Sequence, residues 1–426
     1  VLERGEEADK RQKRVEDFWK NGVLDPDSNV QFGEGGAGTF SDGKLNTLVK
    51  DTFGRNQEVL KRFVEAGAPE EILYQQKPHL GTDVLVPLVQ TLRHQIEEMG
   101  GSFRFRTQVT DLIFENDRLS FVEVNHEEKI PADVCVLAVG HSARDTFSML
   151  AKRGLPMEAK SFAVGVRVEH LQSEMNLALY GEEENEILGA ASYKVTHTCG
   201  NERGVYSFCM CPGGFVVPAA SGPKQVVVNG MSPSNRGSRW SNSGMVVEIR
   251  PEDYSELVGQ EELYLRNGEK VDADSPLALM AFQERLEEVC WLNGGMKQTA
   301  PAQRMDDFMR KKNSFDLPVS SYTPGLLASP LHFWMPEFVT SRLREGFRYF
   351  GKVSRGFLTN EATMIGVETR TSAPVRILRD RDTYQHVTVK GLFPCGEGAG
   401  YAGGIVSAAI DGERCAEGVY NLESNK

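Results

Sequence analysis

The sequence predicts an α/β fold in which the middle of the chain forms a separate domain of mixed α+β structure. Helix and strand patterns alternate at both ends, and a loop rich in glycine follows the first helix. From Phe162 onward short strands and turns dominate. A chain of 426 residues, at roughly 150 residues per domain, has room for two or three domains.

The N-terminal part is predicted to begin with a short strand at Val1 and Leu2, followed by a polar helix over 6–20. Apolar residues at helical spacing predict another helix over 83–99. Alternation predicts two strands over 102–115 and 118–125. A buried strand over 132–139 then ends at Gly140.

In the middle region, helices are expected over 276–291 and 336–350. A hairpin is expected from two strands, 205–211 and 215–217. A short strand near 391–395 and a helix to about Leu422 close the chain. The predicted domain boundaries are 1–160 and 386–426 for the two parts of the split domain, and 161–385 for the inserted domain.

Composition excludes several classes of protein. A net charge of -12 repels nucleic acid. No apolar run approaches the roughly 18 residues of a membrane span, so we expect a cytoplasmic protein. The expected partner is a small-molecule substrate. The seven cysteines are scattered rather than framework-like, and there is no G-x-S-x-G, H-E-x-x-H or C-x-x-C motif.

The order of several motifs indicates a flavin site. Glu3 follows the first strand, where a dinucleotide fold places the acid that binds the adenosine ribose. The glycine loop 33–43 can wrap its N–H groups around an anion. Glu397 could accept a ribityl hydroxyl, and the helix start at 403–405 carries about half a positive charge that would favour an anionic reduced ring by about 1 kcal/mol. The G-x-G-x-x-G fingerprint is expected about 20 residues before the acid, which places it upstream of Val1.

Two alternative sites remain open at this point. Residues 38–44 match the phosphate-loop pattern G-x-x-x-x-G-K, but Leu45 replaces the hydroxyl that would bind magnesium. His197 and Cys199 could join Cys209 and Cys211 as zinc ligands, but the one-residue gaps are poor zinc spacing, so no metal is predicted.

Five residues are candidates for catalysis. Arg370 and Arg376 are two cations that could hold an anionic substrate. Cys209 and Cys211 would lie about 6.6 Å apart on an extended strand, near the limit of a disulfide, which favours two packed thiols near the flavin ring. His141, after the return strand, is a candidate acid or base.

Arg167 and Glu169 alternate onto one face of the strand that begins at Phe162. We interpret them as a surface ion pair.

Five motifs resemble the FAD-dependent, "NAD(FAD)-utilizing" dehydrogenase-like flavoproteins: GEGGAGTFSDGKL (33–45), LAVGHSARDT (137–146), FCMCPGG (208–214), ETRTSAPVRILRD (368–380) and GLFPCGEGAGYAGGIVSAAIDG (391–412). The resemblance implies an FAD/NAD(P)-binding, Rossmann-like domain of the glutathione-reductase type with an inserted substrate domain. Family members carry the glycine fingerprint before the equivalent of residues 1–5, and this chain as given lacks it.

The function expected from these features is that of an FAD-dependent oxidoreductase that transfers hydride through flavin N5 to or from an unidentified small substrate, either anionic or carbonyl-bearing, with NADH or NADPH as a candidate electron donor. A non-catalytic flavin-binding or interaction protein that retains the fold is the alternative. The predicted cofactor contacts are Glu3, Arg4, Gly35, Gly36, Ala37, Gly38, Thr39, Ser41, Val109, Gly140, Gly396, Glu397, Gly403, Gly404 and Ile405.

Overall fold

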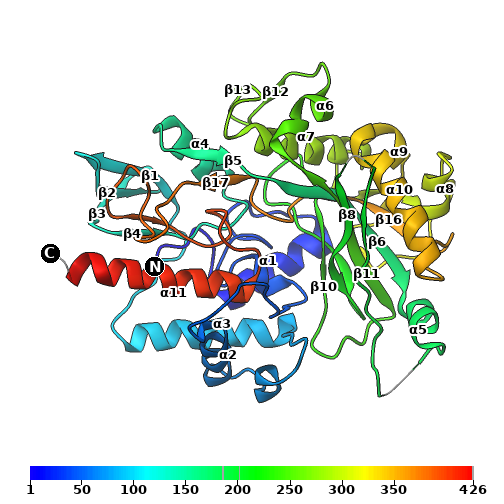
Figure 1. Ribbon diagram of the computed structural model, residues 1–426, viewed down its shortest axis with the longest axis horizontal. Helices are drawn as coiled ribbons and strands as arrows, with labels where there is room; N and C mark the ends of the chain where they lie inside the picture. Colours follow the sequence, from blue (N-terminus) through cyan, green and yellow to red (C-terminus); the bar gives the residue numbers. More distant parts are fainter. Residues whose placement is uncertain (185–186, 201, 425–426) are drawn as a thin grey trace.

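A computed structural model describes residues 1–184, 187–200 and 202–424 and shows a mixed α/β molecule (Figure 1). Its largest element is a seven-stranded sheet with the order β15-β14-β16-β6-β11-β8-β7. Only the β14–β15 pair of this sheet is parallel, within the described residues. The strands are β6 (Phe162–Leu171), β7 (Thr196–Thr198), β8 (Gly204–Cys211), β11 (Trp240–Ile249), β14 (Ala300–Arg304), β15 (Leu326–Ala328) and β16 (Thr363–Glu368).

The two faces of this sheet are covered by different structures. Val164, Val247 and Val205 lie opposite one another on one face, and Gly346 of α10 (Glu337–Val353) packs closely on Val205. The other face carries Arg167, which donates a hydrogen bond to Asn229 of β10 (Val228–Met231). β10 pairs with β9 (Phe215–Pro218), so a second, two-stranded sheet covers this face.

The two ends of the chain lie together on the other side of the molecule (Figure 1). Near the N-terminus are α1 (Ala8–Asn21), η1 (Ala37–Phe40), α2 (Arg55–Glu65), η2 (Glu70–Leu73), α3 (Thr82–Glu98) and a meander of β1 (Val109–Glu115), β2 (Arg118–Val124) and β3 (Glu128–Pro131). β4 (Cys135–Leu137) then pairs in parallel with β18 (Leu392–Pro394). α11 (Ile405–Ser424) follows and packs against α2.

The remaining elements connect these parts. They are α4 (Arg144–Lys152), β5 (Met157–Ala159), α5 (Gln172–Tyr180), η3 (Pro251–Asp253), α6 (Tyr254–Val258), β12 (Leu263–Tyr264), β13 (Lys270–Val271), α7 (Ala278–Asn293), α8 (Met305–Met309), α9 (Leu331–Trp334) and β17 (Val375–Ile377). Among them, α7 packs against β14 and β16 of the large sheet.

The α/β class is confirmed, and the strongly periodic elements lie where the sequence placed them. The helices predicted over 83–99, 276–291 and 336–350 are α3, α7 and α10. The strand expected over 102–115 begins only at Val109, because the preceding residues form a single bridge from Arg104 to Leu2. The strand expected over 132–139 is shorter, and its Val136 is 44% exposed.

The predicted hairpin is wrong, although both of its strands exist. β8 pairs with β7 and β11, whereas β9 pairs with β10 in a separate sheet. The turn at 212–214 does not fold β9 back on β8, because the N–H of Gly213 donates to Gln172 Oε1 at 2.8 Å and its backbone packs against Arg236. Turn residues alone therefore did not identify the partner of either strand.

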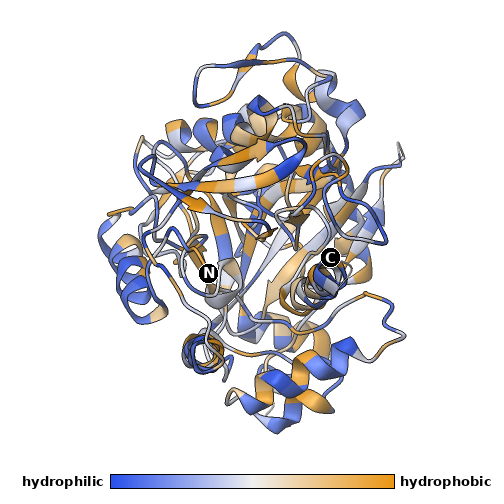
Figure 2. Cartoon of the chain, turned by 90° about the vertical axis from the view of Figure 1, so that its left-hand side faces the viewer, coloured by the Kyte–Doolittle hydropathy of each residue, from blue (hydrophilic) through white to orange (hydrophobic). Residues whose placement is uncertain are grey.

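Hydrophobic residues gather in the interior of the molecule. Figure 2 shows the hydrophobic colour on the central strands and hydrophilic stretches on the peripheral helices. Strand β6 is buried at nine of its ten residues, including Arg167 and Glu169. Across the described part of the chain, no helix combines the length and apolarity that crossing a membrane requires.

Candidate functional site

Segments from both ends of the chain meet at the carboxyl ends of β4 and β18. The parallel pairing of these strands brings the turn after β18 to the turn after β4, and a Cβ at Gly398 would overlap the backbone of Gly140. The glycine loop also reaches this place, because a Cβ at Gly38 would lie 3.0 Å from Cγ1 of Ile405. The structure therefore brings together the predicted loop, the return strand and the start of α11.

Open space lies beside the backbone at this junction. No other atom lies within 4 Å of the position that a Cβ would take at Gly36, Gly140, Gly396 or Gly403, as far as the described residues show. The first N–H groups of η1 and α11 have no acceptor inside their own helices. Backbone that is both open and rich in such donors fits an anionic, nucleotide-like group.

Glu397 lies within this junction. Burial raises the pKa of its carboxyl to about 7, and the Lys160 ammonium nearby limits the rise. Among the described residues, none donates a hydrogen bond to this carboxylate. A largely buried acid that lacks a protein partner can accept a hydrogen bond from a ligand hydroxyl.

Glu3 and Arg4, predicted to contact the cofactor, both interact with the glycine loop. Glu3 Oε1 accepts hydrogen bonds from the N–H groups of Gly5 at 2.8 Å and Gly33 at 3.0 Å. Arg4 pairs with Asp145 and lies 4.4 Å above the ring of Phe32. The strand expected at residues 1–2 is only a single bridge from Leu2 to Arg104, and Glu3 and Arg4 link this N-terminal segment to the glycine loop.

Three other predicted contacts have different surroundings. The hydroxyl of Thr39 is buried and, among the described residues, has no partner, which suits a ligand acceptor or donor. Ser41 donates to the carbonyl of Gly38 at 2.7 Å and so shapes the loop. Val109 lies in β1 opposite Val124 and packs against the main hydrophobic core.

Cys209 and Cys211 lie on an irregular part of β8. Cys211 pairs with Asn242 and Phe208 pairs with Gly244, so Cys209 and Met210 both lie opposite one residue of β11. This bulge gives Cys209 a positive φ of 44°. The Cys211 thiol lies 3.2 Å from the carbonyl oxygen of Cys209.

Two cations lie against this cysteine pair. Lys44, from the glycine loop, donates to the carbonyl of Met210 and pairs with Asp42 at 2.7 Å. Arg167 donates to the carbonyl of Cys209 at 3.0 Å and lies 3.9 Å from the sulfur of Cys211. A hydrogen bond from Cys211, together with these two cations, lowers the pKa of Cys209 to about 5.

The expectation of a surface ion pair between Arg167 and Glu169 is wrong. Both side chains are buried, and Arg167 pairs with Glu368 at 2.7 Å. Glu169 instead accepts hydrogen bonds from Ser321. The second sheet covers this face, and nothing in the local pattern of β6 revealed that cover.

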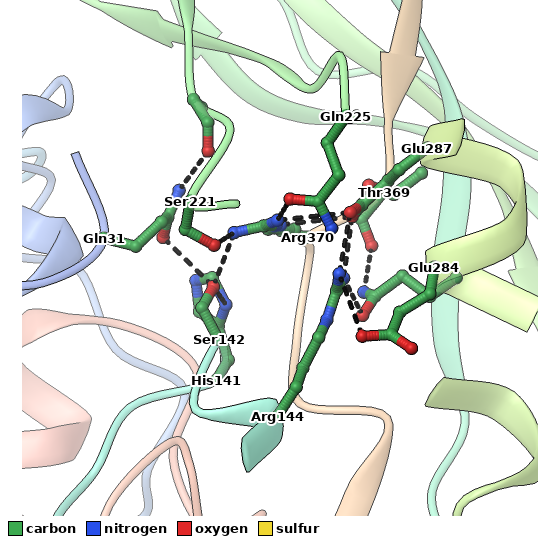
Figure 3. Close-up of polar contacts among 12 residues, drawn as sticks. Gln31, His141, Ser142, Arg144, Ser221, Gln225, Glu284, Glu287, Thr369 and Arg370 are labelled. Atoms are coloured by element: carbon green, nitrogen blue, oxygen red, sulfur yellow. Dashed lines mark hydrogen bonds and ion pairs between the residues drawn. The ribbon is translucent and has the colours of Figure 1, made fainter. Parts of the chain in front are cut away.

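Arg370 lies in a closed polar network (Figure 3). Its Nε and Nη2 donate to Glu287, its Nη1 donates to Ser142 and Ser221, and its Nη2 also donates to Gln225. Burial lowers its pKa to about 10, so it stays charged at neutral pH. Because all five N–H groups have protein partners, Arg370 has no donor left for a substrate, which corrects its predicted role.

His141 and Arg376 complete the predicted catalytic set. Burial, assisted by Arg370, lowers the pKa of His141 to about 3, so the ring is neutral at pH 7. Its Nδ1 lies 2.9 Å from the hydroxyl of Ser142 (Figure 3). Arg376 is separate from that network and pairs with Glu158 at 2.9 Å, with its guanidinium 5.7 Å from the Tyr401 ring.

Neither alternative site has the geometry it needs. A phosphate loop leads into a helix, but Lys44 forms a bridge with His79 and is followed by irregular chain. His197 and Cys199 lie with Glu345, their possible ligand atoms all within 4.8 Å of one another. Neither Cys209 nor Cys211 belongs to that group, so the four candidate zinc ligands do not form one cluster.

The structure adds three charged residues to the site, Lys44, Arg167 and Lys160. The sequence pattern presents Lys44 as the end of a phosphate-loop-like segment and Arg167 as a surface charge, and it gives no signal for Lys160. Lys160 donates to Ser372 at 2.6 Å, and burial together with Arg376 lowers its pKa. The sequence signals for Lys44 are its position directly after the glycine loop and the match of 38–44 to G-x-x-x-x-G-K.

Comparisons with known proteins agree with a flavin site. The family described as "FAD-dependent protein, C-terminal domain-like" matches residues 161–371. An uncharacterized protein of Clostridium beijerinckii (strain ATCC 51743 / NCIMB 8052) is 44% identical over 421 residues, which are 98% of this chain and 75% of that protein.

Remote likenesses occur among solved structures. Glycine oxidase from Bacillus cereus ATCC 14579 is 12% identical, with 82% of this chain and 58% of that chain covered and a TM-score of 0.29. The halogenase PltM is 9% identical, with 82% of this chain and 50% of that chain covered and a TM-score of 0.34. This chain thus spans little more than half of the first structure and half of the second. Because the likeness to the clostridial protein extends over almost the whole chain, this chain belongs to the same family as that protein, and its residues 161–371 match the model of the FAD-dependent protein, C-terminal domain-like family.

Proposed function

We propose that the protein is an FAD-dependent oxidoreductase acting on a small-molecule substrate, as its resemblance to NAD(FAD)-utilizing dehydrogenases suggests. One observation carries the proposal: Glu397 lies between the turn packed on Gly140 and the start of α11 that the glycine loop reaches, and it interacts electrostatically with Cys209 in the bulge of β8. FAD supplies hydride transfer when it is bound. The chain's own residues would bind the cofactor, orient it and hold charge near it.

The donor set fits the parts of FAD. The N–H groups of Ala37 and Gly38, together with the hydroxyl of Thr39, would bind the pyrophosphate. Glu397 in its ionised form would accept a hydrogen bond from a ribityl hydroxyl, and because its pKa is raised to about 7 its protonated fraction at pH 7 would be able to donate one. The N–H groups at the start of α11 would face the ring and favour added negative charge there.

The substrate would approach from the side of β8. Lys44 is 39% exposed at its side chain and Cys209 is partly exposed, so both can meet a molecule from solvent. Arg376 also retains a buried Nε without a partner among the described residues and can bind an anionic group. Arg370 and His141 would act only indirectly, by fixing the return strand through Ser142.

The first experiment compares two glycine substitutions in the complete protein. Among the described residues, no atom outside the immediate chain neighbours lies within 4 Å of a Cβ built at Gly403 or Gly412, and neither glycine has a positive φ, so the two positions are matched in the local space that a side chain would first enter. Gly403→Leu should weaken FAD binding by at least about tenfold, because the side chain enters the proposed cofactor space. Gly412→Leu, further along α11, should bind FAD normally.

FAD affinity by fluorescence titration and melting temperature by calorimetry would be measured for both variants. Equal FAD affinity for the two would contradict the placement of the cofactor. Anaerobic addition of NADH or NADPH to the FAD-loaded protein then tests the donor: bleaching of the flavin band supports a dehydrogenase. No bleaching with either nucleotide or with a broad substrate panel would favour the alternative of a non-catalytic flavin-binding protein.

A further inference from the structure

The bulge in β8 takes two cysteines out of regular strand geometry. Residues two apart on an extended strand have Cα atoms about 6.6 Å apart, near the limit of a disulfide. Here the bulge and the positive φ of Cys209 bend the strand, and the Cys211 thiol folds back to within 3.2 Å of the carbonyl oxygen of Cys209. The limit that applies to a regular strand therefore does not apply to this pair.

The two sulfurs differ in access. Cys211 is fully buried, whereas Cys209 is partly exposed. They differ in acidity as well, because the hydrogen bond and the charge of Cys209 raise the pKa of Cys211. One thiol is thus an accessible thiolate at neutral pH and its neighbour is a buried, protonated thiol.

Charged groups face Cys209 from four other segments: the glycine loop, β6, β16 and the turn after β18. Lys44 comes from the glycine loop with Asp42 beside it, and Arg167 comes from β6 with Glu368 beside it. Glu397, from the turn after β18, also acts on Cys209, and its negative charge opposes the thiolate. The two cations lie against the thiol pair itself, so they favour a negative charge on Cys209.

We propose that Cys209 and Cys211 are a dithiol pair that reduces a small disulfide, with Cys209 attacking and Cys211 completing the exchange. The Cys209 thiolate attacks one sulfur of the substrate R–S–S–R, a Cys209–S–R bond forms, and one R–S⁻ leaves and takes a proton from water. Cys211 then loses its proton and attacks the Cys209 sulfur. The second R–S⁻ leaves with that proton, so two electrons pass from the protein to two product thiols.

The inference deepens the proposed function by naming small disulfides as the substrate class, and to that extent rests on it. A donor that reduces the FAD-loaded protein would supply the two electrons that return the pair to the dithiol. The exchange itself needs only the two cysteines and the disulfide. It can therefore be tested separately from turnover.

The first test uses the full chain, reduced with dithiothreitol, desalted and mixed with oxidised glutathione at pH 7. Thiols that remain free are alkylated, and the peptides are read by mass spectrometry. The unaltered protein should lose free thiols at 209 and 211 and gain a bond between them, with no glutathione retained. Cys211→Ser should instead hold one glutathione on Cys209.

Cys209→Ser should react at least about tenfold more slowly than the unaltered protein, because Cys211 is buried and protonated. Cys415→Ser is the matched control: this cysteine is also buried near a second cysteine and beside Arg379, and its loss should change nothing. Glutathione on other cysteines only, or a pair that stays fully alkylated, would overturn the inference.

The second test asks whether Lys44 stabilises the thiolate. The rate of alkylation of Cys209 by iodoacetamide should rise with pH around a midpoint near 5, and Lys44→Met should move that midpoint upward. An unchanged midpoint would contradict the role of Lys44. If exchange occurs but FAD titration fails, the proposed function fails alone; if FAD binds but no exchange occurs, the inference fails alone.

Discussion

The Arg370 network and the junction around Glu397 both bury charge, but they differ in how completely that charge is satisfied. Glu287 is fully buried and accepts hydrogen bonds from Arg144, Arg370 and Thr369. Glu397 has no such donor among the described residues, and the glycine backbone next to it is open. A network in which every polar group has a protein partner stabilises the fold. A buried polar group without a protein partner can instead be hydrogen-bonded by a ligand.

The largest effect is expected from breaking the closed network. Glu287→Ala leaves two buried arginines without their carboxylate, which should lower the free energy of unfolding by about 3–5 kcal/mol. Urea unfolding measures it. Glu288→Ala is the control, because Glu288 is 45% exposed and its pair with Arg285 should contribute less than about 1 kcal/mol. Similar small losses in both variants would contradict the role of the network.

A smaller effect, dependent on pH, is expected at the open junction. The pKa of Glu397 is raised to about 7 in the folded protein, so the unfolded chain holds fewer protons there between about pH 4.5 and 7. The unaltered protein should therefore lose stability as the pH rises through this window. Glu397→Gln removes that loss, so its stability relative to the unaltered protein should increase by up to about 3 kcal/mol from pH 4 to pH 8.

Unfolding of both proteins in urea at a series of pH values measures this difference. A constant difference across the series would show that the acid is ordinary and solvated. Added FAD sharpens the comparison further, since a ligand that hydrogen-bonds Glu397 should change the pH dependence of the unaltered protein more than that of Glu397→Gln.

The smallest effect is expected from the second predicted arginine. Arg376→Ala removes a pair in which the side chains are 39% and 50% exposed, so the free energy of unfolding should change by less than about 1 kcal/mol. Calorimetry of Arg376→Ala beside Arg370→Ala measures the contrast. A large loss at Arg376 would place it in a structural network like that of Arg370.

The sequence was sufficient where a pattern was local. Helical spacing located α3, α7 and α10, and the order of Glu3, the glycine loop and Glu397 identified segments that do lie together. Such features depend on periodicity or on a backbone conformation that only glycine tolerates, and both can be recognised in a single stretch of sequence.

Features that depend on contacts with residues distant in the sequence could not be predicted. The partner of β8 is β11 rather than the next strand, and the burial of Arg167 comes from β10 and from Glu368. Likewise, the five oxygen atoms that accept hydrogen bonds from Arg370 come from separate parts of the chain. The segment around Arg370 therefore gives no sign that its donors are already used, and it suggests a substrate ligand. Tertiary contacts, and not local preference, determine these environments.

Hydrogen exchange of the complete protein with and without FAD would show most directly whether one cofactor is enclosed by both ends of the chain. FAD should slow exchange together in three segments, 33–45, 138–141 and 396–407, with a smaller effect in β8. Bound FAD that protects none of these segments, or protects only one end of the chain, would contradict the account.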